Sequence, residues 1–186
     1  MVIGLVVACT LTACATPGYP GDPPTTTPPT SAAPSPTQTP TPTPTPDAAT
    51  PPERPDMSTV DAETAEAVAV YFLELYPYVY ATGDLTEWRA LSHPECIFCA
   101  SVITNVEEMV AKGEHWEGGS WTIAAVDLVA RTNTGFDLRL ETTEEPATRM
   151  SGSGEVLETT SGGPGVARMV VVTEGDHLLV RATEID

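Results

Sequence analysis

The chain has 186 residues, four cysteines and a formal net charge of −18 at pH 7. Residues 56–186 carry 23 acidic and seven basic side chains, so −16 of this charge lies in that part of the chain. Such a field repels nucleic acid and anionic lipid headgroups, and we expect neither as a partner. We interpret this charge as one that keeps the domain soluble. The alternative is an acidic surface that binds a cationic partner.

The N-terminal residues are typical of a bacterial lipoprotein signal peptide. Val2 to Thr12 form an apolar run with the length of a signal-peptide hydrophobic region, well below the roughly 20 residues that cross a bilayer as a helix. The run ends in Leu11-Thr12-Ala13-Cys14, which resembles a lipobox. This resemblance implies cleavage before Cys14 and acylation of its thiol. Fatty acyl chains such as palmitate would then anchor the mature chain to the outer face of the cell membrane.

A second sequence similar to a lipobox ends at Cys9, in Val6-Val7-Ala8-Cys9. Cleavage there would leave only about six apolar residues, fewer than a signal peptide needs. Cys14 is therefore the predicted lipidation site, and residues 1–13 are the predicted signal peptide. No Lys or Arg precedes the apolar run, which leaves a start codon further upstream open.

Residues 14–55 are predicted to form a disordered tether. Fifteen of the 19 prolines lie between Pro17 and Pro55, with repeated Thr-Pro steps and almost no large apolar side chain. Proline fixes φ and removes a backbone donor, so this composition favours an extended polyproline II spacer that reaches roughly 120 Å at about 3.1 Å per residue. We interpret the segment as a stalk, with a ligand for a proline-recognition module as the alternative. The density of Thr and Pro also raises the hypothesis of glycosylation.

Residues 56–186 are long enough to form one globular domain with a single core. It should begin with a helix over residues 60–81, where apolar residues recur at helical spacing and Ser58-x-x-Asp61 has the spacing of a capping box. Pro77 removes one backbone hydrogen bond and predicts a kink or an early stop, and Gly83 should end the segment. Four tyrosines crowd this helix and are interpreted as core, with the lining of a ligand cavity as the alternative. They are Tyr71, Tyr76, Tyr78 and Tyr80.

Two further helices are predicted before the first strand. One covers residues 84–91, where apolar side chains recur at three-residue steps. The next runs roughly from Pro94 to Lys112, with Ser92 and Glu95 in capping-box spacing at its start. Its expected buried stripe is Cys96, Cys99, Ile103, Val106 and Val110.

After Gly113 the period of the apolar residues changes to two, which predicts an antiparallel sheet. Turns that contain glycine separate the strands. The expected strands are Trp121–Arg131, Phe136–Thr143, Gly154–Thr160, Val166–Thr173 and His177–Ile185. Three helices followed by these strands predict an α+β fold, with the helices on one face of a curved antiparallel sheet.

Cys96 and Cys99 are the two thiols that remain, and outside the cytoplasm a disulfide is their expected state. Residues three apart in a helix have Cβ atoms about 5 to 6 Å apart, too far for a bridge, so the first turn must distort. A redox centre is the alternative, since a helix N-terminus lowers the pKa of a thiol. Redox Cys-x-x-Cys motifs follow a strand, whereas helices precede this pair, and we therefore favour the structural bridge.

A zinc site would require His93 and His115 to join the two cysteines. The helix between Cys99 and Lys112 spans about 20 Å at 1.5 Å per residue, which leaves His115 far from the other three. We therefore predict no metal site and no cofactor.

Asp127 is the carboxylate that an enzyme hypothesis would use. It shares strand parity with Trp121, Ile123 and Val129, so it would be buried if that side of the strand faced the helices. Burial would raise the pKa of its carboxyl, as a general base requires. The opposite parity is equally apolar and would place Asp127 in solvent, and we favour this second orientation.

Several motifs together resemble an uncharacterised family of actinobacterial lipoproteins of unknown function. Besides the lipobox and the tether, they are Tyr-Ala-Thr-Gly-Asp from Tyr80 to Asp84, Cys96-Ile97-Phe98-Cys99 and Glu117-Gly118-Gly119-Ser120-Trp121. The likeness spans essentially the whole domain and implies a location and an architecture but no activity. The element order is also similar to the cone fold of ketosteroid-isomerase-like and nuclear-transport-factor-like proteins, in which helices close the concave side of a sheet.

We therefore expect an extracytoplasmic, lipid-anchored protein whose domain is a non-catalytic binding or interaction module. Its partners would be the membrane, through the lipid anchor, and an unknown protein or small molecule. The alternative is an enzyme or carrier that uses the cone interior for a small ligand, and a thiol redox protein is a third hypothesis. Cavity volume separates the first two, because a packed interior leaves no substrate site.

Overall fold

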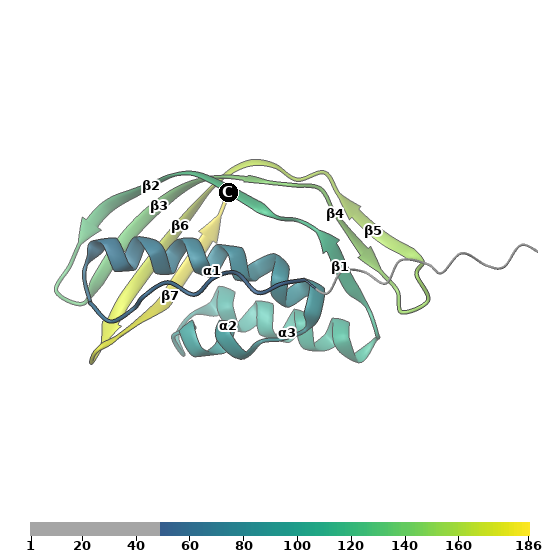
Figure 1. Ribbon diagram of the computed structural model, residues 1–186, viewed down its shortest axis with the longest axis horizontal. Coiled ribbons are helices and arrows are strands. Elements are labelled where there is room, and N and C mark those ends of the chain that lie inside the picture. The colour runs from purple at the N-terminus through teal and green to yellow at the C-terminus, as the bar shows by residue number, and fades with distance from the viewer. Residues whose placement is uncertain (1–48) are drawn as a thin grey trace, which may run out of the picture. The chain divides into compact units, whose positions relative to one another are not determined.

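The computed structural model of the chain describes residues 49–186 (Figure 1). The predicted signal peptide, Cys9, Cys14 and residues 14–48 of the predicted tether lie outside the described residues. Within this range three helices precede seven strands, which confirms the predicted α+β class. Within residues 49–186, no helix combines the length and the apolar character that crossing a membrane requires.

Helix α1 (Ala62–Thr82) begins at Asp61, later than the capping box at Ser58 predicted. The Oδ1 atom of Asp61 accepts a hydrogen bond of 2.9 Å from the backbone N–H of Thr64. This bond, more than any other contact, holds the pKa of the Asp61 carboxyl below its usual value. Asp61 is therefore the N-cap, because it satisfies a donor that the first turn leaves without a partner.

The second half of α1 continues through Pro77 to Thr82, so the helix does not stop early. Gly83 ends it, as predicted, in a left-handed conformation with φ at 75°. The backbone N–H of Gly83 donates to the carbonyl oxygen of Val79 at 2.8 Å. Glycine suits this position because it has no Cβ to oppose a positive φ.

The next two helices are α2 (Thr86–Leu91) and α3 (Ile97–Ala111). Helix α3 begins later than predicted, because Ser92 does not cap it: the Ser92 hydroxyl donates instead to the carbonyl oxygen of Trp88 at 2.6 Å. The buried stripe of α3 also differs from the expected one, since Val110 is 51% exposed. Its buried side chains are Cys99, Val102, Val106 and Met109.

The strands form two antiparallel sheets. The first has the order β1-β4-β5 and the second the order β2-β3-β6-β7. Strands β1 and β4 have four residues each and were not predicted, because so short a segment shows no clear alternation. The strands are β1 (His115–Gly118), β2 (Trp121–Arg131), β3 (Gly135–Glu144), β4 (Ala147–Met150), β5 (Val156–Thr160), β6 (Gly163–Glu174) and β7 (His177–Ile185).

Three sharp bends join the two sheets, at the short connections between β1 and β2, β3 and β4, and β5 and β6. The Glu-Gly-Gly-x-Trp motif forms the first bend. Gly118 has φ at +79°, and a Cβ atom there would lie 2.5 Å from the carbonyl oxygen of Pro146 in the second bend. Glycine is therefore required where these two bends touch. The sheets together arch over the helices (Figure 1).

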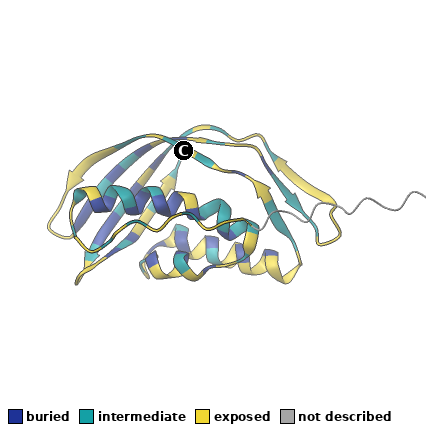
Figure 2. Ribbon diagram, viewed as in Figure 1, coloured by how far each residue is buried: buried dark blue, intermediate teal, exposed yellow. Residues whose placement is uncertain are grey.

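The hydrophobic core lies between α1 and the concave side of the four-stranded sheet and continues between α1 and the helices α2 and α3. On α1 the consecutive residues Tyr71, Phe72 and Leu73 are all buried, so this helix is covered on more than one face (Figure 2). The rings of Phe72 and Trp88 stack with centroids 3.9 Å apart, and Trp88 Nε1 donates to the carbonyl oxygen of Cys99 at 3.2 Å. This part of the interior is therefore packed with side chains.

Residues 49–61 form an extended segment that runs along α1 (Figure 1). Ala49 and Thr50 lie beside the C-terminal end of α1, while Val60 packs against the core at its N-terminal end. Arg54 forms an ion pair of 3.5 Å with Glu87 of α2. Contacts with the domain therefore begin upstream of residue 56.

Candidate functional site

Asp127 lies in solvent, as the favoured orientation predicted. Its side chain is 60% exposed and forms an ion pair of 3.4 Å with Arg139. A β-bulge between Ile123 and Ala125 reverses the alternation of β2, so Ile123 and Val126 face the core while Asp127 faces outwards. The interpretation of Asp127 as a buried general base is therefore wrong.

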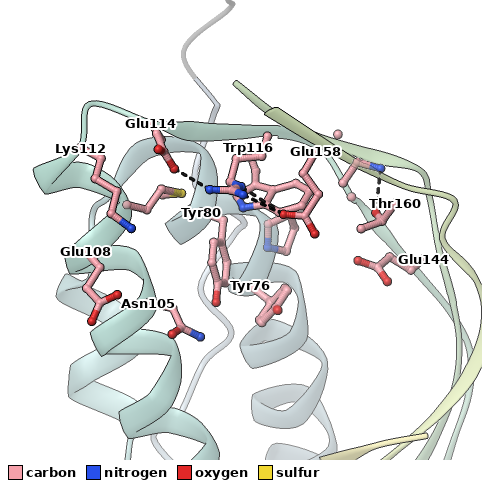
Figure 3. Close-up of a pocket in the computed structure, with 16 residues that line it drawn as sticks. Tyr76, Tyr80, Asn105, Glu108, Lys112, Glu114, Trp116, Glu144, Glu158 and Thr160 are labelled. Carbon is pink, nitrogen blue, oxygen red and sulfur yellow. Dashed lines mark hydrogen bonds and ion pairs between the residues drawn. The ribbon is translucent and has the colours of Figure 1, made fainter. Parts of the chain in front are cut away.

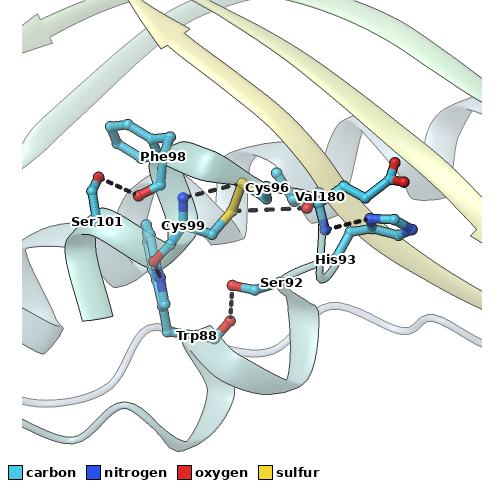
Figure 4. Close-up of a disulfide and its surroundings, with 9 residues drawn as sticks. Trp88, Ser92, His93, Cys96, Phe98, Cys99, Ser101 and Val180 are labelled. Atoms are coloured by element: carbon cyan, nitrogen blue, oxygen red, sulfur yellow. Dashed lines mark hydrogen bonds between the residues drawn. A yellow bond between two sulfur atoms is a disulfide. The ribbon is translucent and has the colours of Figure 1, made fainter. Parts of the chain in front are cut away.

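The sulfur atoms of Cys96 and Cys99 are at bonding distance, with the Cα atoms 5.2 Å apart (Figure 4). Cys96 precedes the helix as its N-cap in an extended conformation, and its Sγ accepts a hydrogen bond of 3.1 Å from the backbone N–H of Cys99. The distortion expected of the first turn is thus avoided, because only Cys99 is helical. Both residues are 1% exposed, so solvent does not reach this bridge in the folded state.

The two histidines of the rejected zinc set lie in different parts of the domain. His93, in the loop before α3, contacts Glu174 at 3.0 Å, and its backbone N–H donates to the carbonyl oxygen of Val180. His115, on β1, contacts Glu117 at 3.3 Å. In the described part of the chain, no three His, Cys, Asp or Glu side chains are grouped so that they could hold a metal ion.

A pocket of about 470 Å³ lies between α1, α3 and the concave face of the three-stranded sheet (Figure 3). Tyr76 and Tyr80, one helical turn apart on α1, contribute its central rings, with centroids 4.9 Å apart. Tyr71 is instead buried in the core. The tyrosines therefore divide between the two predicted roles.

The sheet wall of the pocket follows from strand alternation. Trp116 and Gly118 of β1, Ala147 and Arg149 of β4, and Glu158 and Thr160 of β5 all line it. These residues form two rows in register across the sheet, Trp116–Arg149–Glu158 and Gly118–Ala147–Thr160. Because successive side chains point to opposite faces, one face of each short strand supplies the whole wall. The bends aim this face at the helices.

Arg149 is held in place by two carboxylates. Its Nη1 atom lies 2.7 Å from Glu114, just after α3, and its Nη2 atom lies 3.0 Å from Glu158 of β5. The hydrogen bond to Glu114, more than that to Glu158, raises the pKa of the Arg149 guanidinium. The charge of Arg149 is therefore already compensated, and its role is to tie the edge of the sheet to the helix layer.

Glu144 is the half-buried carboxylate of the pocket. It ends the inward-facing row of β3, in which Phe136, Leu138, Leu140 and Thr142 are buried. Burial raises the pKa of the Glu144 carboxyl, and among residues 49–186 no side chain forms an ion pair or hydrogen bond with it. Figure 3 shows this carboxylate directed from the strands towards Tyr76. When ionised, this carboxylate has no counter-charge among the described residues, and a bound cation could provide one.

Two aromatic side chains lie near Glu144, one of them lining the pocket (Tyr76) and the other behind it (Trp121). Trp121 lies opposite Glu144 in the sheet register and packs edge-on against Tyr76, with ring centroids 6.2 Å apart. The Trp121 Nε1 atom is buried without a hydrogen-bond partner in the described residues. Burial, followed by the nearby Tyr80 hydroxyl, raises the pKa of Tyr76, so Tyr76 stays neutral at physiological pH. The surroundings of Glu144 are therefore aromatic and contain little compensating charge.

Sequence reasoning missed Glu144, Arg149 and Trp116. Glu144 could have been found, because it continues the alternation that starts at Phe136. Arg149 and Trp116 lie on the two strands that were too short to predict. The motif Glu117-Gly118-Gly119-Ser120-Trp121 was noticed but not interpreted, and it supplies both the bend and two pocket-lining glycines.

Comparison with solved structures finds several similar chains at low identity. The intermembrane space region of the chloroplast protein ARC6 has a TM-score of 0.49 and 12% identity, over 68% of this chain and 96% of that chain. The β subunit of benzoate 1,2-dioxygenase from Burkholderia mallei has a TM-score of 0.45 and 10% identity, over 68% and 90%. A protein from Catenulispora acidiphila has a TM-score of 0.43 and 12% identity, over 64% and 88%.

Comparison with curated proteins gives no match. A protein-family model does match, over residues 34–174, and this range covers most of the folded domain and the last part of the predicted tether. The family is described as a family of unknown function, DUF6318. The chain belongs to this family.

Proposed function

We propose that this protein is a lipoprotein of the cell envelope whose domain is a non-catalytic binding module, with the pocket between α1, α3 and the three-stranded sheet as its ligand site. The observation that carries the proposal is the pocket, which lies outside the packed part of the interior. By the cavity criterion stated above, a pocket of this kind favours a small-molecule ligand, so the module of this proposal is one that binds a small molecule. The pocket volume of about 470 Å³ is in the range of small-molecule sites. Aromatic rings with a few convergent polar groups are also typical of such sites.

The anchoring part of the proposal comes from the sequence. The Leu-Thr-Ala-Cys motif provides the thiol of Cys14 for acylation, and two or more acyl chains hold a protein at a membrane stably. The proline-rich segment would then carry the domain away from the membrane surface, on the outer side of the cell.

The anchor is tested by expressing the full chain and its Cys14→Ser variant in the native bacterium. The unchanged chain should fractionate with the membrane, and intact mass should show acyl groups and loss of residues 1–13. The variant should lose both the acyl mass and the membrane fraction. Recovery of uncut, unacylated wild-type chain from the cytosol would refute the anchoring.

The pocket is tested by native mass spectrometry of the full chain purified from its own envelope. A small molecule should accompany the wild type and be lost from Tyr80→Ala, which opens the centre of the pocket. Tyr78→Ala is the matched control, because Tyr78 lies on the same helix but outside this pocket and donates to Asp84 at 3.2 Å. Equal retention by both variants would argue against this site.

An enzyme that acts on a small ligand is the second candidate function. One observation favours it: burial raises the pKa of Glu144, and raised carboxyl pKa values are typical of general acids. Turnover of the retained molecule by the wild type but not by Glu144→Gln would establish this candidate in place of the binding module.

A further inference from the structure

We infer that the ligand of this pocket carries a positive charge on an apolar body, and that Glu144 is the counter-ion of that charge. The inference rests on the proposed function, since it names the chemical class of what the pocket holds. Its basis is the distribution of charge and aromatic surface among the lining side chains.

The four carboxylates of the pocket are not equivalent. Glu114 and Glu158 are bound to Arg149, at 2.7 and 3.0 Å. Glu108 is exposed to solvent in the last turn of α3. Glu144 alone combines partial burial with the absence of an ionic or hydrogen-bonding partner within residues 49–186. A half-buried carboxylate gains most from an opposite charge that is brought to it, because that charge replaces lost hydration.

The aromatic surface beside Glu144 also suits a cation. Tyr76 and Tyr80 present rings with centroids 4.9 Å apart and planes at 51°, and Trp116 lines the pocket from the sheet side. Aromatic faces attract ammonium and guanidinium groups, and the attraction grows as the cation is desolvated. Figure 3 shows Glu144 and the two tyrosines converging from opposite walls. One cation could therefore contact the carboxylate and a ring together.

The remaining lining accounts for the apolar body. Pro77, Met109 and Ala147 contribute apolar surface to the pocket. The domain as a whole carries a net charge of −16 over residues 56–186, a field that concentrates cations and repels anions. Lys112 lines the same pocket, but it is exposed at the C-terminal end of α3. An anionic ligand held by Lys112 is the competing outcome of the test.

The experiment uses isothermal titration calorimetry at pH 7 on the full chain with three probes of equal length: hexylammonium, 1-hexanol and hexanoate. Hexylammonium should bind about tenfold more tightly than hexanol, the ratio expected from one ion pair and one cation–π contact, and hexanoate most weakly. Glu144→Gln should remove the part of this preference that the ion pair supplies, so that hexylammonium binds only slightly more tightly than hexanol through the remaining aromatic contact, and it should leave the affinity for hexanol unchanged. Glu145→Gln is the matched control, because Glu145 is exposed, accepts from the Ser120 hydroxyl at 3.0 Å and does not line the pocket.

Two results would overturn the inference. One is equal binding of the three probes, or preference for hexanoate; the other is hexylammonium binding that Glu144→Gln and Glu145→Gln leave equally intact. Either result leaves the pocket standing as a ligand site, because retention of the native molecule and its loss in Tyr80→Ala are measured separately. Absence of binding by all three probes, together with no retained molecule, would refute both proposals.

Discussion

Glu144 lies directly opposite Trp121 in the register of β2 and β3, at the last paired position before the sheet bends. The buried side chains that precede it in the same row of β3 are apolar, apart from Thr142. The strand that carries this carboxyl therefore places it in partly apolar surroundings, and we expect this position to affect stability.

Replacing Glu144 with Gln should stabilise the protein at pH 7. Burial raises the pKa of this carboxyl in the folded state, so its ionised form is disfavoured by folding. The destabilisation is fully present above the folded pKa and disappears as the pH falls below the unfolded pKa. The gain should be less than about 1 kcal/mol, since the carboxyl still contacts solvent. Thermal unfolding between pH 7 and pH 4 should show the two melting temperatures converging as the pH falls. A constant difference across this range, or the same gain in Glu145→Gln, would contradict the argument.

Replacing Gly118 with Ala should destabilise the fold by about 3 kcal/mol or more. The new Cβ would meet both a φ of +79° and the carbonyl oxygen of Pro146 at 2.5 Å. Gly154→Ala is the matched control, because Gly154 has φ at +81° with nothing within 4 Å of the added atom. This control should cost roughly 1 kcal/mol from backbone strain alone. Chemical denaturation of both variants measures the difference, and equal losses would show that the contact between the bends is unimportant.

Removing the Cys96–Cys99 bridge should cost about 2 kcal/mol in the chain-entropy model for so short a loop. Which residues replace the cysteines should also matter, because Cys96 caps α3 through its sulfur atom. Serine at position 96 keeps an N-cap acceptor and alanine does not, so the double serine variant should be more stable than the double alanine variant by about 1 kcal/mol. Urea unfolding of the two variants tests this, and identical stabilities would remove the capping role.

Replacing Asp127 with Asn should change stability by no more than about 0.5 kcal/mol, because the side chain is a solvent-exposed partner of Arg139. Retention of a small molecule should also be unchanged, since Asp127 does not line the pocket. Denaturation and native mass spectrometry check the two statements. Loss of the bound molecule would return Asp127 to the list of functional residues.

Whether a segment forms a helix or a strand could be predicted for most elements, because the spacing of apolar residues differs between the two. Strands β2 and β7 have the predicted bounds, and the helix that ends at Gly83 was recognised by its glycine. The orientation of Asp127 could not be derived from alternation, since the bulge between Ile123 and Ala125 shifts the parity of β2 without any sequence mark.

The pocket was harder to predict than the core. Its lining comes from α1, α3, β1, β3, β4 and β5, elements that meet only because three bends fold one sheet back towards the helices. Local sequence patterns describe each element and carry no information on such a convergence. Glu144 is the pocket residue whose inward orientation could be predicted from the sequence, because every second residue from Phe136 faces inwards and this count reaches Glu144.

The extended segment along α1 affects how the domain responds to mechanical load. A force applied at Ala49 reaches the domain beside the C-terminal end of α1, while the segment joins the helix at its other end. Tension would therefore peel residues 49–61 away one after another, separating Arg54 from Glu87 before any strain reaches the stacked rings of the core. The contacts of this segment would thus break one after another under load, while the residues that line the pocket keep theirs.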